Sequence, residues 1–161
     1  LYRCLSKTIF SASSLLKILN DEICETTSRG MFVTMIVGVY DKNKNELLLA
    51  NAGHEPPLIF SKDGNFKTID EAGPPLGIAP NFKFAEQIIS FKESSMYIFT
   101  DGITEMKNNN GEMLGQEGFQ DYIKKYQTTP NNKRLQKMIE DLISSGRIQK
   151  DDLTIVTVDG N

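Results

Sequence analysis

The chain has 161 residues, of which 39% are hydrophobic and 24% are charged, and no apolar run approaches transmembrane length, so a disordered or membrane-spanning chain is excluded and one domain is expected. Eighteen Lys and Arg against 21 Asp and Glu give a net charge of −3 with scattered basic residues, which argues against a nucleic-acid partner. The only cysteines, Cys4 and Cys24, lack metal-ligand spacing, which excludes a disulfide framework and a zinc site and fits a reducing cytoplasm.

The first predicted element is an amphipathic helix over residues 13–26, where leucine and isoleucine recur at helical spacing. A strand rich in β-branched and aromatic residues follows at 32–40, and a polar turn leads into a second strand at 46–51, so we expect a hairpin. Shorter strands are predicted at 58–61, 66–69 and 84–91. Strands in this order predict an antiparallel meander.

The second half begins with a short apolar strand at 96–100, which ends at Asp101 and Gly102 and is followed by a polar loop. Two amphipathic helices are predicted at 115–126 and 131–145. A last strand at 153–158 follows Asp151 and Asp152. Because the helices lie at the two ends of a run of strands, we expect the α+β class, with antiparallel sheet packed against helices.

Two aspartates occupy matching strand ends. Asp101 follows the strand at 96–100, and Asp151 precedes the strand at 153–158. If these strands pair antiparallel, the two ends adjoin and the carboxylates converge, which would suit a hard divalent cation such as Mg²⁺ or Mn²⁺. The alternative is an ordinary Asp-Gly turn and a solvated Asp-Asp edge, and spacing alone favours that alternative.

His54 is the only histidine, and it lies in a loop that Gly53 bends and two prolines stiffen. No Ser or Cys stands at a recognisable nucleophile position, so the sequence argues against triad chemistry. His54 is then a ligand, an acid, or a hydrogen-bonded loop residue. The segment 73–77 (Gly-Pro-Pro-Leu-Gly) lacks the Lys and the strand-to-helix context of a phosphate loop and is predicted to be a rigid turn.

Six short motifs occur in a fixed order along the chain. They are Met31-Phe-Val-Thr34, Asn51-Ala-Gly-His54, Gly73-Pro-Pro-Leu-Gly77, Thr100-Asp-Gly-Ile-Thr-Glu105, Gly111-Glu-Met-Leu-Gly115 and Asp151-Asp-Leu-Thr154. Together they resemble the bacterial PPM-type protein serine/threonine phosphatases, in the branch of sporulation stage II protein E and the sigma-factor regulators. The resemblance covers residues 13–158, and the ordered set is more specific than any single motif.

The resemblance implies an antiparallel β-sandwich flanked by helices, with two Mn²⁺ or Mg²⁺ ions at its rim and a metal-bridging water that attacks phosphorus. It reverses the preference stated above for Asp101 and Asp151, which become ligands of one of the ions. Asp152 becomes a neighbour of the site or an edge residue, and Gly102 lets the backbone pass close to the metals. His54 either lies beside the site or only packs its own loop.

The sequence also departs from the family. The metal-bridging aspartate motif that the family places before its first long helix is absent, so we expect residues 1–161 to be the carboxy-terminal two-thirds of a single phosphatase domain, incomplete at the N-terminus and inactive alone. The parent is then either a longer enzyme or a degenerate homologue. The Pro-Gly-Asp that precedes the Asp101 strand in the family is replaced by Lys92-Glu-Ser-Ser95, which changes a turn.

The function implied is metal-dependent hydrolysis of phosphoserine or phosphothreonine on a regulatory protein, by analogy an anti-sigma-factor antagonist. The alternative is a non-catalytic pseudophosphatase that binds such a partner. A cytoplasmic location is expected, with an upstream sensor domain as in relatives and without nucleic-acid or direct membrane contact.

Overall fold

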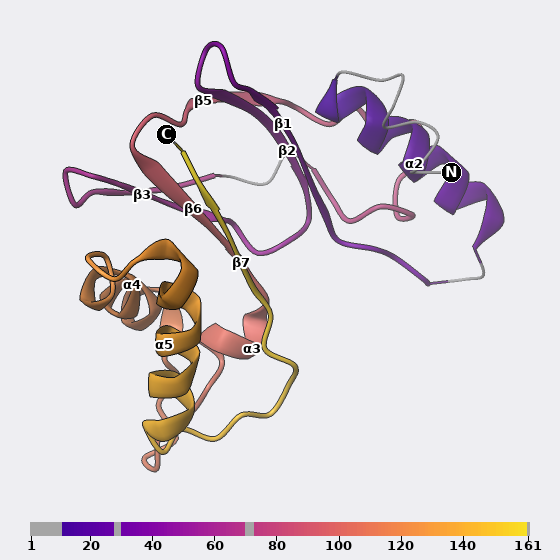
Figure 1. Ribbon diagram of the computed structural model, residues 1–161. Coiled ribbons are helices and arrows are strands. Elements are labelled where there is room, and N and C mark those ends of the chain that lie inside the picture. Colours follow the sequence, from indigo (N-terminus) through magenta and orange to yellow (C-terminus); the bar gives the residue numbers. More distant parts are fainter. Residues whose placement is uncertain (1–10, 28–29, 70–72, 161) are drawn as a thin grey trace. The chain divides into compact units, whose positions relative to one another are not determined.

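Figure 1 shows the computed structural model, which describes residues 11–27, 30–69 and 73–160. The chain divides into two compact units. The first unit comprises the residues up to Pro56, Thr68–Glu93 and the end of the chain from Gly160, and the second comprises Pro57–Lys67 and Ser94–Asp159. Cys4 lies outside the described residues, and Cys24 is a free thiol. No helix within the described part of the chain is long and apolar enough to cross a membrane.

The first unit is built on a three-stranded antiparallel sheet in the order β1-β2-β5, formed by β1 (Met35–Asp41), β2 (Glu46–Ala52) and β5 (Gln87–Ser90). Helix α2 (Ala12–Thr26) packs against β1 and β2 through its leucine stripe, so the helix covers the sheet as its amphipathic pattern predicts. The Ser11 side chain caps this helix by accepting a hydrogen bond from the Ser14 amide at 3.2 Å.

The segment 73–77 is held on α2 by a buried asparagine. Asn20 accepts a hydrogen bond from the Gly77 amide at 3.0 Å and donates one to the Ala79 carbonyl oxygen at 2.8 Å. Gly77 has φ +93°, and a Cβ there would lie 2.8 Å from Ile23 Cγ2. The segment is therefore a turn that hydrogen bonds and close contacts hold against α2, in agreement with the rigid turn predicted from the sequence.

The second unit is built on a four-stranded antiparallel sheet in the order β4-β3-β6-β7. Its strands are β3 (Leu58–Ser61), β4 (Phe66–Thr68), β6 (Ser94–Phe99) and β7 (Ile155–Asp159), and its helices are α3 (Asp101–Thr104), α4 (Gly115–Lys125) and α5 (Asn131–Ser144). The buried rings of Tyr97, Phe99 and Phe119 lie at the centre of its core, with the Phe99 and Phe119 centroids 4.8 Å apart.

A buried arginine fastens α5 to this sheet. Arg134 is 6% exposed, and its guanidinium donates hydrogen bonds to Tyr97 Oη at 2.9 Å and Ser95 Oγ at 3.1 Å on β6. It also pairs with Asp159 Oδ1 on β7 at 3.2 Å and donates to the Asn131 side chain on its own helix. Burial raises the pKa of Tyr97 although the Arg134 charge opposes that rise. Polar bonds thus supplement apolar packing at this junction.

The structure confirms the α+β class, the antiparallel sheets and the three long helices, whose boundaries fall within one residue of those predicted. The single meander is wrong, because β2 pairs with β5 rather than with the next strand, β3. The chain turns away after β2 at Gly53, which has φ +67°, and Pro56 and Pro57 have no N–H to continue a ladder. The polar loop predicted after Asp101 begins instead as the one-turn helix α3.

Candidate metal centre

The two predicted aspartates lie at the same end of the second unit's sheet. Strands β6 and β7 pair antiparallel, and Phe99 at the end of β6 lies opposite Ile155 at the start of β7. Beyond this pair the Thr100 amide still donates to the Thr154 carbonyl oxygen at 3.2 Å. Asp101 therefore leaves the sheet at the edge where Asp151 and Asp152 approach it, and the predicted pairing of the two strand ends is confirmed.

Gly102 lies in direct contact with the Asp151–Asp152 backbone. A Cβ at position 102 would lie 2.5 Å from the Asp152 carbonyl oxygen and 3.4 Å from that of Asp151. Gly102 is buried in the first turn of α3, so a larger residue would push that helix away from the acidic segment. The resemblance implied that Gly102 lets the backbone pass close to the metals. The structure shows a close approach to the Asp151–Asp152 backbone, and the approach to metals stays a prediction.

Thr100 is a second connection, and sequence reasoning missed it. Its hydroxyl donates a hydrogen bond to the Asp152 carbonyl oxygen at 3.1 Å and accepts one from the Thr154 amide at 3.1 Å. The available signal was its position directly before Asp101, at the end of an apolar strand. The pattern did not distinguish this role, because threonine is common at strand ends for its β-propensity alone.

The three carboxylates are exposed at this edge. Asp151 Oδ1 accepts a hydrogen bond from the Asp152 amide at 2.7 Å. Asp101 opens α3, and its carbonyl oxygen accepts from the Glu105 amide at 2.8 Å. Carboxylate oxygens in a water-accessible place are the donors that Mg²⁺ and Mn²⁺ prefer.

Carboxylates are the donor type that a hard divalent ion prefers, and the close approach at Gly102 brings together the backbone segments that carry Asp101 and Asp151. Across residues 11–27, 30–69 and 73–160, however, no three His, Cys, Asp or Glu side chains gather into a group that could hold a metal ion. Asp101 and Asp151 by themselves would fill only part of a coordination shell, and their role as metal ligands stays a prediction.

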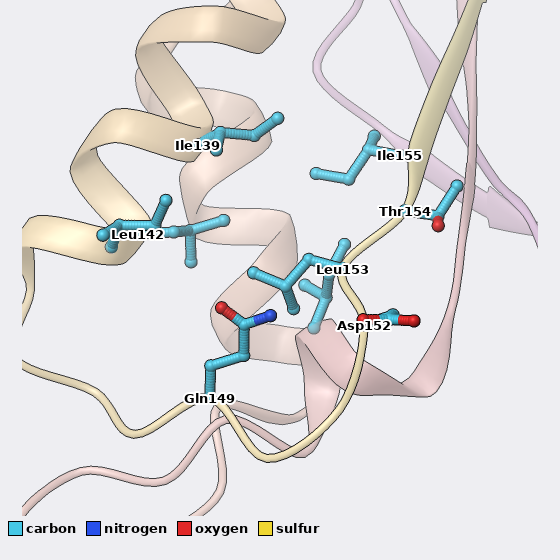
Figure 2. A pocket seen from close by; sticks show the side chains of 9 residues that line it. Ile139, Leu142, Gln149, Asp152, Leu153, Thr154 and Ile155 are labelled. Atoms are coloured by element: carbon cyan, nitrogen blue, oxygen red, sulfur yellow. The ribbon is translucent and has the colours of Figure 1, made fainter.

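A pocket of about 490 Å³, lined by both apolar and polar side chains, lies beside the acidic segment, between that segment and α5. Figure 2 shows that Leu153 and Ile155 point toward α5, whereas the Asp152 and Thr154 side chains point to the opposite side of the chain. This alternation is that of extended backbone. The segment 152–155 thus turns Leu153 and Ile155 toward α5 and turns the Asp152 and Thr154 side chains away from it.

His54 lies in the first unit, whereas Asp101, Gly102, Asp151 and Asp152 all lie in the second. The completely buried Asn51 side chain accepts a hydrogen bond from the His54 amide at 2.9 Å and donates one to its carbonyl oxygen at 2.8 Å. The imidazole Nδ1 lies 3.1 Å from the Glu55 carbonyl oxygen. These contacts support local packing of the loop, the second of the two roles left open for His54.

Comparison with known proteins gives a family match over nearly the whole chain. The family model described as "Stage II sporulation protein E (SpoIIE)" matches residues 1–160. Phosphoserine phosphatase RsbU of Bacillus subtilis (strain 168) is 27% identical over 157 residues, which are 96% of this chain and 47% of RsbU. The chain thus spans about half the length of that curated relative.

Two solved structures show the same fold. The RsbU and RsbW domains of a Mycobacterium tuberculosis protein superpose with a TM-score of 0.81 at 20% identity, covering 99% of this chain and 44% of that chain. The phosphatase domain of SpoIIE from Bacillus subtilis, from a crystal described as presoaked with Mn, gives a TM-score of 0.66 at 18% identity, covering 99% of this chain and 71% of that chain.

Proposed function

The chain belongs to the stage II sporulation protein E family of PPM (PP2C-type) phosphatases, and from this premise we propose that it carries two metal ligands of a phosphoserine/phosphothreonine protein phosphatase. Its homologue RsbU is a phosphoserine phosphatase. The observation that carries the proposal is the meeting of the Asp101 and Asp151 strand ends at one sheet edge.

Each residue at this edge has a separate task in the proposal. Asp101 and Asp151 hold one divalent ion through their carboxylates, and Asp152 flanks it. Gly102 keeps the two backbones in contact. When bound, Mn²⁺ or Mg²⁺ supplies hydroxide near neutral pH and neutralises charge on the phosphoryl oxygens. Because water is then the nucleophile, no side chain of this chain needs to attack phosphorus, which suits a sequence with a single histidine.

The chain spans part of the length of its relatives. We place residues 1–161 as the carboxy-terminal two-thirds of one phosphatase domain that holds two ions, whose bridging carboxylate lies outside this sequence. The support for this placement is that the match covers 71% of the solved SpoIIE phosphatase-domain chain. Residues 1–161 alone are then expected to be inactive.

For the substrate, we propose a phosphorylated regulatory protein of the anti-sigma-factor antagonist class in the cytoplasm. The support is the likeness to RsbU and to a chain that carries RsbU and RsbW domains. A sensor domain upstream would then control the phosphatase. The alternative function is a pseudophosphatase that binds such a partner without hydrolysing it.

Phosphate release by the full-length protein separates the two functions. With Mn²⁺ and a phosphoserine protein substrate, we expect turnover in the wild type and loss of turnover in Asp101→Asn, because the amide is a weaker metal ligand than the carboxylate. The matched control is Asp121→Asn, the same change at an exposed position of α4, which should retain turnover. Wild-type protein that binds the substrate without releasing phosphate would instead support the pseudophosphatase.

A further inference from the structure

We propose that Thr100 is a positioning residue for the metal centre, whose hydroxyl holds the Asp151–Asp152 segment against the end of β6. This inference rests on the proposed function, because it assigns Thr100 the task of setting the separation between Asp101 and Asp151. It concerns a residue that is not itself a metal ligand.

The first support is the number of bonds that Thr100 makes to one short segment. Its amide donates to the Thr154 carbonyl oxygen, its hydroxyl accepts from the Thr154 amide, and the same hydroxyl donates to the Asp152 carbonyl oxygen. The three donor–acceptor distances are 3.1 to 3.2 Å. The strand pairing has already ended at Phe99 and Ile155, so the hydroxyl extends the connection where the ladder stops.

The second support is a bond that Thr100 does not make. Thr100 is the N-cap residue of α3, a position where threonine normally accepts a hydrogen bond from an amide in the first turn. Here the side chain makes no such bond. Its single proton and its acceptor lone pair are used on Asp152 and Thr154 instead. The hydroxyl therefore serves the acidic segment rather than its own helix.

The third support is the contact on the other side of Asp101. Gly102 touches the Asp152 carbonyl oxygen, which also accepts the Thr100 hydroxyl bond. The two residues that flank Asp101 in the sequence therefore both approach the Asp152 carbonyl group, Thr100 through a hydrogen bond and Gly102 through close backbone contact. Two carboxylates without a cation between them repel each other. The Thr100 bonds hold the two backbone segments together and so oppose that separation.

The test is a pair of variants of the full-length protein. Thr100→Val keeps the size of the side chain and removes both hydroxyl bonds, whereas Thr100→Ser keeps the hydroxyl. We expect Thr100→Val to weaken Mn²⁺ binding by roughly 10- to 100-fold in isothermal titration calorimetry, the range typical for residues that orient metal ligands. Thr100→Ser should bind Mn²⁺ nearly as the wild type does. Thr128→Val, the same change at an exposed turn position, is the control.

Two further readouts separate positioning from general stability. In metal-free protein, hydrogen exchange of the Thr154 amide should be faster in Thr100→Val than in Thr100→Ser, because only the valine variant lacks the acceptor. Turnover of Thr100→Val should recover at saturating Mn²⁺. Unchanged Mn²⁺ affinity in Thr100→Val would overturn the role of Thr100 alone. Failure of the wild type to bind Mn²⁺ would overturn the proposed function and the metal role of Thr100 with it.

Discussion

Three consecutive residues, Thr100, Asp101 and Gly102, carry the connection between the end of β6 and the acidic segment before β7. Thr100 contributes hydrogen bonds to the acidic segment, and Gly102 allows close contact with that segment because it has no side chain. Asp101, between them, presents its carboxylate at the same edge. In the proposed centre, the two residues that flank Asp101 therefore set the geometry, Thr100 through its hydroxyl and Gly102 through its missing side chain.

Replacing Gly102 with alanine tests this view. The new Cβ would lie 2.5 Å from the Asp152 carbonyl oxygen, and backbone there must shift to relieve the clash. We expect a loss of about 1–3 kcal/mol in the free energy of unfolding, the range for overpacked positions, together with weaker Mn²⁺ binding. Thermal unfolding and titration calorimetry measure the two effects.

The control for this variant is Gly118→Ala in α4, where the nearest atom to the new Cβ is the terminal Leu114 Cδ1 at 2.7 Å. A leucine tip can move, and alanine favours helix by up to about 1 kcal/mol over glycine. This control should lose little stability and no Mn²⁺ affinity. Equal Mn²⁺ affinity in Gly102→Ala and Gly118→Ala would show that the contact at Gly102 has no part in the centre.

Among the elements, α5 packs on the sheet through buried apolar side chains and is also bonded to it by one buried arginine. Arg134 reaches Ser95 and Tyr97 on β6 and Asp159 on β7. These contacts lie toward the opposite ends of the strands from Asp101 and Asp151. Mutations can therefore change the packing of α5 on the sheet without changing the proposed metal centre, since the two features use different residues near the opposite ends of β6 and β7.

Arg134→Met should destabilise the protein by about 3 kcal/mol, because it leaves Asp159 and the two hydroxyl groups without their charged partner. Lys133→Met, the neighbouring change at an exposed position, should cost much less. Chemical denaturation of both variants measures the difference. A loss in Arg134→Met no larger than that in Lys133→Met would mean that apolar packing alone holds α5.

At the scale of the whole molecule, sequence patterns predicted the elements better than the connections between them. The long helices were predictable because each carries an apolar stripe over several turns. Helix α3 was not, because four residues are too few for a periodic pattern. The pairing of β2 with β5 was missed because adjacency along the chain is only a tendency in sheets.

The candidate site shows a similar limit. Asp101 and Asp151 were selected by resemblance to a family, since Asp-Gly and Asp-Asp are also ordinary turn and edge sequences. The strand pairing confirms that their strand ends meet, and their metal role stays a prediction. Thr100 could not be found from the pattern, because a side-chain bond to a segment distant in sequence depends on the folded register.

Anomalous diffraction from Mn²⁺-soaked crystals of the full-length protein tests most directly whether Asp101 and Asp151 hold a divalent ion. We predict an anomalous peak within coordination distance, roughly 2–2.6 Å, of carboxylate oxygens of both aspartates. The peak should disappear or weaken strongly in Asp101→Asn crystals. Crystals soaked at saturating Mn²⁺ that show no peak between these two residues, or a peak held elsewhere, would contradict the account.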